Sequence, residues 1–272
     1  MGLSLRNTLT ATACAIICGY SAVALGQTSE DELAKQLSNP IASLTSVPLQ
    51  LNWDDNVGPA EEGTKTTLNV QPVIPVSISE DWNMISRTIV PIISQGDIFP
   101  GAGSQFGLGD TTQSLFFSPK APTASGWVWG VGPVLLIPTG TDDLLGTGKW
   151  GAGPTAVVLK QTSSGWTYGA LINQIWSFAG DDNRADVNGT YFQPFLAKGL
   201  GKGRTISVNF ESSYNWETDK ATVPLNLAYS KVTRWGKQLV SLQGGVRYYV
   251  EQPQSDSQWG LRFVVTLLYP KK

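Results

Sequence analysis

The amino-acid sequence predicts an all-β protein, a transmembrane antiparallel β-barrel of about twelve strands with a short N-terminal periplasmic helix. Three observations carry this prediction. Large apolar side chains alternate with small or polar ones from Thr45 to Tyr269. The connections between the alternating segments are long and short in turn, and acidic residues gather in the long ones. This combination is typical of strands that separate lipid from a polar interior.

The first 26 residues have the pattern of a secretory signal peptide. Arg6 is followed by an uncharged stretch over residues 8–25, and small residues precede a cleavage point after Gly26. Cleavage there leaves 272 − 26 = 246 residues. Both cysteines, Cys14 and Cys18, leave with the signal, so we expect neither disulfides nor thiolate chemistry in the mature chain.

Residues 27–44 are predicted to form a periplasmic N-terminal segment with a short helix over 29–38. Ser29 suits the N-cap, acidic residues fill the first turn, and Asn39-Pro40 ends the pattern. We expect this helix outside the main domain, against one mouth of the barrel that residues 45–272 form.

Period-two alternation divides the remaining chain into strands. The last one, "WGLRFVVTLLY", is apolar at every second position; in a closed barrel it pairs with the first strand, so its apolar face meets lipid and no edge stays open. One segment, "MISRTIVPI", is ambiguous because Arg87 shares parity with Ile85 and Ile89. The predicted strands are 45–53, 67–78, 84–95, 110–118, 127–138, 150–160, 166–178, 188–198, 204–216, 221–233, 238–250 and 258–269.

Charge and aromatic residues are distributed as a membrane barrel requires. The long connections (53–66, 96–110, 139–149, 179–187, 217–220 and 251–257) hold fifteen acids against four bases, which we assign to outer loops. Six aromatic residues fall at strand ends, where girdles contact the lipid headgroups. The alternative is a secreted soluble sandwich with these aromatics in its core. The six are Trp82, Trp127, Trp166, Trp216, Trp259 and Tyr269.

Polar side chains on the opposite faces of the strands are predicted to line the lumen. Arg247 and Arg262 become near cross-strand neighbours if their turn is symmetric about residues 254–255, so they need a counter-charge or a bound anion between them. Glu211 and outer-loop acids are the candidates. Two interpretations stay open: a structural ladder that rigidifies the interior, or a constriction that attracts anions or carboxylates. The lumen candidates are Arg247, Arg262, Glu211, Asn209, Gln243, Gln193, Asn173 and Gln71.

The sequence contains no histidine, which removes Ser-His-Asp and Cys-His catalysis and the commonest metal ligand. We therefore expect no enzyme, no cofactor and no catalytic metal. Four acid pairs in the outer connections could bind divalent cations through oxygen ligands, but we favour the interpretation that they form a solvated rim. They are Asp54-Asp55, Glu61-Glu62, Asp142-Asp143 and Asp181-Asp182.

Segments from residue 39 to the C-terminus resemble a family of bacterial outer-membrane proteins named after the phenol meta-degradation pathway. Its members are often labelled simply "transporter" and, misleadingly, neuromedin U. The similar stretches include "NPIASLTSVPLQLNW", "GLGDTTQSLFFSPK", "LGTGKWGAGPTAVVL" and "WGLRFVVTLLYP". The resemblance implies an outer-membrane β-barrel that passes small aromatic or other hydrophobic compounds. It brings no functional residues to this chain.

The functional hypothesis is a channel of the cell outer membrane for passive uptake of small solutes, selected by the lumen candidates. A plugged structural or surface-interaction barrel without transport is the rival, and a soluble secreted binding module is third. The expected partners are outer-membrane lipid and lipopolysaccharide, the barrel assembly machinery during insertion, and a small-molecule solute. Nothing in the sequence points to nucleic acid.

Overall fold

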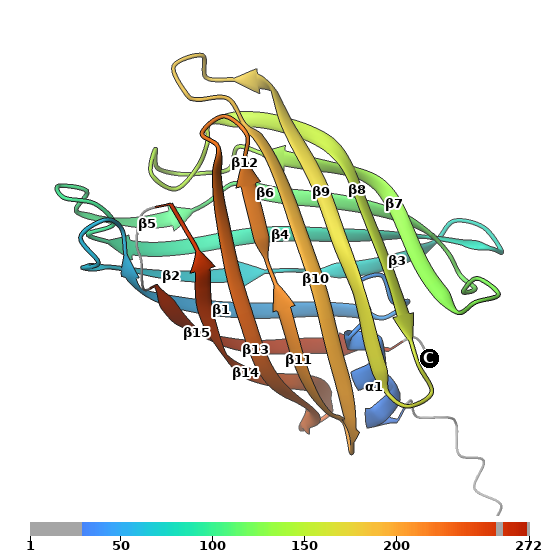
Figure 1. Ribbon diagram of the computed structural model, residues 1–272. Helices are drawn as coiled ribbons and strands as arrows, with labels where there is room; N and C mark the ends of the chain where they lie inside the picture. The colour runs from blue at the N-terminus through green and yellow to red at the C-terminus, as the bar shows by residue number, and fades with distance from the viewer. Residues whose placement is uncertain (1–28, 254–257, 271–272) are drawn as a thin grey trace, which may run out of the picture.

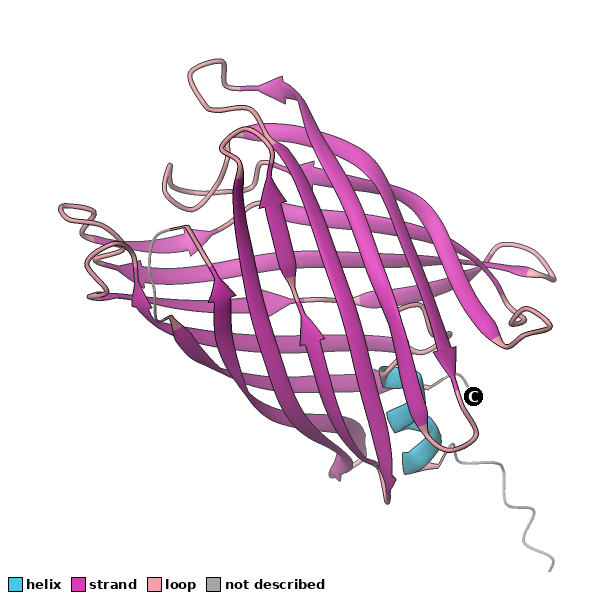
Figure 2. Ribbon diagram, in the orientation of Figure 1, coloured by secondary structure: helices cyan, strands magenta, loops and turns pink. Residues whose placement is uncertain are grey.

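The computed structural model describes residues 29–253 and 258–270, which form one closed antiparallel β-barrel with a single short helix inside one end (Figures 1 and 2). The predicted signal peptide lies outside the described residues. The elements are α1 (Glu30–Leu37), β1 (Thr45–Val57), β2 (Gly63–Val70), β3 (Val73–Ser77), β4 (Trp82–Gly96), β5 (Ser104–Leu108), β6 (Thr111–Pro119), β7 (Trp127–Ile137), β8 (Lys149–Gln161), β9 (Trp166–Gly180), β10 (Asn188–Gly201), β11 (Arg204–Phe210), β12 (Ser212–Asn215), β13 (Lys220–Trp235), β14 (Gln238–Glu251) and β15 (Trp259–Tyr269).

The 15 strand segments form 12 membrane-spanning strands, as predicted, because three of the spans are each divided into two segments. Gln71-Pro72 separates β2 from β3, where proline cannot donate to the strand ladder. Gly109-Asp110 separates β5 from β6, and Glu211 separates β11 from β12. The first and last strands pair from Thr45↔Tyr269 to Asp55↔Trp259, which closes the cylinder and confirms the predicted absence of an open edge.

Alternation along the last strand sorts side chains between the two faces of the wall. Phe263 is 53% exposed on the outside, whereas its neighbour Arg262 is 3% exposed inside. The same alternation leaves an outer surface of large apolar residues, including Val131, Ile172 and Leu227. Such a surface on a closed barrel faces acyl chains, and the protein is an outer-membrane barrel. In the described chain no helix is long and apolar enough to cross a membrane.

Aromatic pairs ring both ends of the wall, as predicted. We call the end with α1 and the short connections the turn end, and the opposite end the loop end. Edge-to-face contacts at the turn end join Trp82 to Trp129 at 5.8 Å and Trp127 to Tyr168 at 5.9 Å. At the loop end, Trp53 contacts Trp259 at 5.4 Å. These two girdles mark the membrane interfaces.

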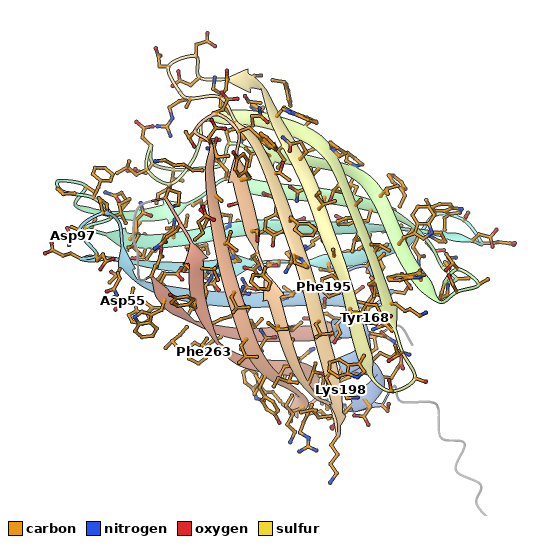
Figure 3. All side chains as sticks on the ribbon, viewed as in Figure 1. Asp55, Asp97, Tyr168, Phe195, Lys198 and Phe263 are labelled. Carbon is orange, nitrogen blue, oxygen red and sulfur yellow. The ribbon has the colours of Figure 1, made fainter. Side chains whose placement is uncertain are left out.

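The two ends of the barrel also differ in the charge of their side chains. Figure 3 shows Asp55 and Asp97 at the loop end, and Lys198 at the turn end. The Lys198 ammonium lies 5.0 Å from the ring centroid of Trp166 and donates to the Ser164 carbonyl. We predict that the turn end, with its short connections, faces the periplasm.

The N-terminal segment, residues 29–44, is packed into the turn end of the barrel instead of lying outside it. The helix begins as predicted, with the Ser29 hydroxyl accepting from the Glu32 N–H at 3.1 Å. Its apolar side is buried: Leu33 is 0% exposed and packs in one cluster with Val232 of β13 and Leu268 of β15. Our expectation of a helix outside the main domain is therefore wrong, because inward-facing barrel residues supply its apolar contacts.

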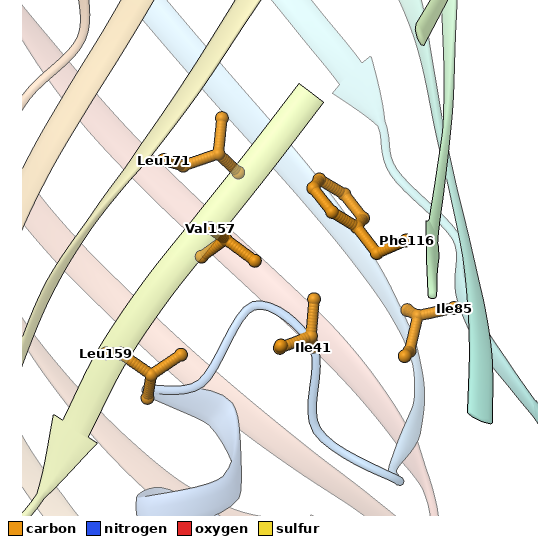
Figure 4. Close-up of a cluster of buried hydrophobic side chains, with 6 residues drawn as sticks. All are labelled: Ile41, Ile85, Phe116, Val157, Leu159 and Leu171. Atoms are coloured by element: carbon orange, nitrogen blue, oxygen red, sulfur yellow. The ribbon is translucent and has the colours of Figure 1, made fainter. Parts of the chain in front are cut away.

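The chain after the helix crosses to the opposite wall. Ile41 is 4% exposed and lies among Ile85 of β4, Phe116 of β6 and Leu159 of β8 (Figure 4). Polar contacts also tie the helix to the wall, since the Asp31 carboxylate accepts from the Gly203 N–H at 2.6 Å. The N-terminal segment thus fills part of the lumen at the turn end.

Candidate functional site

A cavity of about 570 Å³ occupies the lumen between the N-terminal segment and a set of charged side chains. Ala34, Leu37 and Ala42 line it at the turn end, and Glu211 and Arg262 line it farther toward the loop end. Its volume is in the range of small-molecule sites. The cavity therefore has the size and the mixed polar and apolar lining of a solute-binding chamber.

Five charged side chains form a belt across strands β1, β2, β14, β15 and the β11–β12 break. We call Asp54, Lys65, Glu211, Arg247 and Arg262 the charged belt. The Arg262 guanidinium donates to both Glu211 carboxylate oxygens at 2.7 Å. Arg247 donates to the same carboxylate at 3.3 Å and lies 3.6 Å from Asp54. Charge-assisted, bidentate bonds of this kind hold side chains in one arrangement.

The predicted counter-charge between the two arginines is Glu211, as the sequence suggested. The predicted register is wrong by two residues, however: Arg247 pairs with Gly260, and Arg262 pairs with Gly245. Each arginine thus faces a glycine, which avoids placing two like charges directly opposite each other. A Cβ atom at Gly260 would lie 2.5 Å from the Asp54 Oδ1 atom, so only glycine leaves room for the belt.

Seven of the eight predicted lumen residues line the cavity. The exception is Arg247, which lies in the charged belt and contacts Glu211 and Asp54. Two of the seven are held by neighbouring polar groups, since Asn209 accepts from Asn226 at 3.0 Å and Gln71 accepts from Arg87 at 3.4 Å. The seven are Arg262, Glu211, Asn209, Gln243, Gln193, Asn173 and Gln71.

Sequence reasoning missed three charged lumen residues. Arg87 lines the cavity beside Ile89, so the parity that made its segment ambiguous was the correct signal. Asp54 was counted with the outer loops, but β1 continues to Val57 and Asp54 is 4% exposed inside. Lys65 pairs with Asp54 across β1 and β2. With Arg87 added to the belt, the six residues comprise four bases and two acids, a net charge of 4 − 2 = +2.

The connection over residues 138–148 folds inward at the loop end. Leu145 is 7% exposed, and the Leu144 carbonyl accepts from Gln95, an inward-facing residue of β4, at 3.2 Å. The Asp110 carboxylate accepts from the Thr147 N–H and hydroxyl, both at 2.6 Å. Arg184 of the next loop donates to the Asp143 carbonyl at 2.6 Å. This loop therefore narrows the outer mouth.

The two members of the acid pair Asp142-Asp143 have different partners. Asp143 lies 3.3 Å from Arg184, whereas Asp142 accepts from the Leu144 N–H within its own loop. Among the described residues, no group of three or more His, Cys, Asp or Glu could hold a metal ion.

In the loop between β9 and β10, the Asp186 carboxylate lies 3.2 Å from the Lys149 ammonium. The hydrogen bond from Lys149 lowers the pKa of the Asp186 carboxyl below its ordinary value.

No family model matches the chain, and no curated protein matches it significantly. Among solved structures it is similar to an outer membrane channel from Pseudomonas putida F1, with a TM-score of 0.66, 13% identity, and coverage of 84% of this chain and 96% of that chain. The NanC porin has a TM-score of 0.52 and 9% identity over 81% of this chain and 98% of its own. A lower TM-score of 0.48, with 13% identity over 86% and 97% of the two chains, relates it to outer membrane phospholipase A from Escherichia coli. The likeness to the first two is one of fold, and those two proteins are a channel and a porin.

Proposed function

We propose that the protein is an outer-membrane channel for passive entry of small solutes, including aromatic and other hydrophobic compounds. The observation that carries the proposal is the 570 Å³ lumen cavity, with polar and charged side chains on one wall and apolar side chains near its turn end. The fold shared with a channel and a porin supports the same activity, as does the resemblance of the sequence to an outer-membrane transporter family.

The rival is a plugged barrel that does not conduct. One specific observation favours it: the N-terminal segment packs across the periplasmic mouth through Leu33 and Ile41, both buried. The loop over residues 138–148 narrows the other mouth. In this alternative the protein serves as a structural or surface-interaction barrel.

Single-channel recording in planar bilayers separates the two proposals. The mature chain is inserted into a planar bilayer bathed in KCl, and solute entry is measured in parallel by liposome swelling. Discrete current steps with swelling by small solutes support the channel. A silent bilayer and no swelling, from protein whose gel migration changes on heating as a folded barrel requires, support the plugged barrel.

A further inference from the structure

Among the described residues that line the cavity, one cation forms no ion pair. Three charged residues line the cavity: Arg87, Glu211 and Arg262. Two guanidinium nitrogens of Arg262 donate to Glu211, and the third, Nε, donates to the Asn52 side-chain oxygen over 2.7 Å. Glu211 is similarly saturated, because both of its oxygens already accept from arginine. These two groups satisfy each other and offer little to a solute.

Arg87 differs from Arg262 in its partners. Among the described residues, its side chain donates one hydrogen bond, a long one of 3.4 Å from Nη2 to the Gln71 side-chain oxygen. It forms no ion pair with any described residue. A half-buried guanidinium carries five N–H donors in a planar fork, which matches the two oxygens of a carboxylate. Arg87 is therefore free to bind an anion in the cavity.

The side chains around Arg87 indicate which chemical groups a bound anion would carry besides its charge. Ile89 lines the cavity two positions along the same strand, and Phe195 and Leu171 line the wall made by β9 and β10. Tyr191 connects the two environments: its ring packs against the apolar cluster around Ile41, and its hydroxyl interacts electrostatically with Arg87 and Glu211. The site thus offers one cation at one end and apolar surface at the other.

We propose that Arg87 and the cavity around it bind small organic monocarboxylates, with the carboxylate on the guanidinium and the apolar body against Ile89 and Phe195. The inference rests on the proposed function in one respect, because it names the class of solute that the lumen would pass. Inorganic anions satisfy only the charged half of the site, and neutral aromatics satisfy only the apolar half.

Binding of benzoate to the purified mature barrel in detergent, measured by calorimetry, tests this site. Benzamide keeps the ring without the charge, and acetate keeps the charge without the ring. We expect benzoate to bind more tightly than either. Loss of a charge-assisted bidentate contact in Arg87→Gln should weaken benzoate binding by about tenfold or more, with benzamide binding unchanged. Arg87→Lys should recover part of the loss.

Arg234→Gln is the matched control, because Arg234 is an exposed arginine at the turn end of β13, away from the cavity. It should bind benzoate as the unmodified protein does. Heat-modifiable gel migration confirms that each variant is folded. Equal benzoate affinity in the unmodified protein and in Arg87→Gln, or benzamide binding as tight as benzoate, would overturn the site.

The bilayer recordings keep this inference separate from the proposed function. Benzoate binding that depends on Arg87 in a protein that carries no current supports the site and contradicts the channel. Current steps that continue unchanged in the presence of benzoate, together with no calorimetric binding, overturn the site and leave the channel standing.

Discussion

The two halves of the lumen are built on different interactions. Toward the loop end, the charged belt joins strands that are not paired with each other, such as β15 and the β11–β12 break, through ion pairs such as Arg262–Glu211, at 2.7 Å. Toward the turn end, apolar side chains of the wall, such as Phe116 and Val232, pack against the N-terminal segment. The belt is part of the wall itself, whereas the segment is an insert that no strand pairing requires.

This difference separates stability from access. Breaking the belt leaves charges buried without partners inside the wall, which costs free energy of unfolding. Releasing the segment exposes apolar lumen surface but leaves every strand pair in place. We therefore predict that the outer half governs barrel stability and ion preference, and that the inner half sets the width of the solute path.

Deletion of residues 30–43 should have the largest effect on function. It removes α1 and Ile41 from the periplasmic mouth while preserving the β1–β15 closure that begins at Thr45. Single-channel conductance in KCl should rise severalfold, because the aqueous cross-section at the mouth increases. Glu32→Gln, which alters only an exposed helix residue, serves as the control. Equal conductance with and without the segment would show that the segment does not limit the path.

Glu211→Gln should have the largest effect on stability. It leaves Arg262 and Arg247 without their shared counter-charge, and removing one partner from a buried ion pair costs about 3 kcal/mol. Denaturant titration of the folded barrel in detergent measures the loss. A Glu211→Gln/Arg262→Gln double variant should recover part of it, because fewer buried charges remain unpaired. A single variant as stable as the unmodified protein would mean that the belt does not hold the wall.

Ile41→Ala should weaken the packing of the N-terminal segment without destabilising the barrel wall. The lost side chain is 4% exposed, and truncation of such a residue costs about 2 kcal/mol of local packing. Protease cleavage within the N-terminal segment should become faster, while the denaturant midpoint of the barrel stays the same. Ile74→Ala, on the outer face at 47% exposure, is the control. If the midpoint fell with no change in cleavage, the segment would be part of the folded core of the wall.

Asp186→Asn should have the smallest effect. The hydrogen bond from Lys149 lowers the pKa of this carboxyl, so its stabilising effect is complete above the ordinary aspartate range and is lost as the pH falls through the lowered pKa. Because Asp186 is exposed at the loop end, the effect should stay local to its loop. NMR titration of the loop amides measures it. A change in the global denaturant midpoint as large as that of Glu211→Gln would contradict this assignment.

The strand number, the closure and the two girdles could be predicted from sequence because each depends on local alternation, for which lipid on one face imposes a strict period of two. The register between β14 and β15 could not, since it places Gly245 and Gly260 opposite the arginines, and the close contacts that require glycine at these positions come from β13 and β1. Arg87 was ambiguous because its inward face is apolar on both sides of it, at Ile85, where the N-terminal segment packs, and at Ile89, which lines the cavity. The position of the helix could not be predicted either, because the apolar lumen surface that contacts Leu33 is formed by strands far from it in the sequence.

The most direct test of the account is the reversal potential of the mature protein and of its 30–43 deletion across a KCl gradient. A solute path that passes four bases and two acids predicts a reversal potential of the sign that marks chloride preference in both proteins, with larger currents after the deletion. Potassium preference, or the absence of current from the folded deletion variant, would contradict a solute path through this lumen.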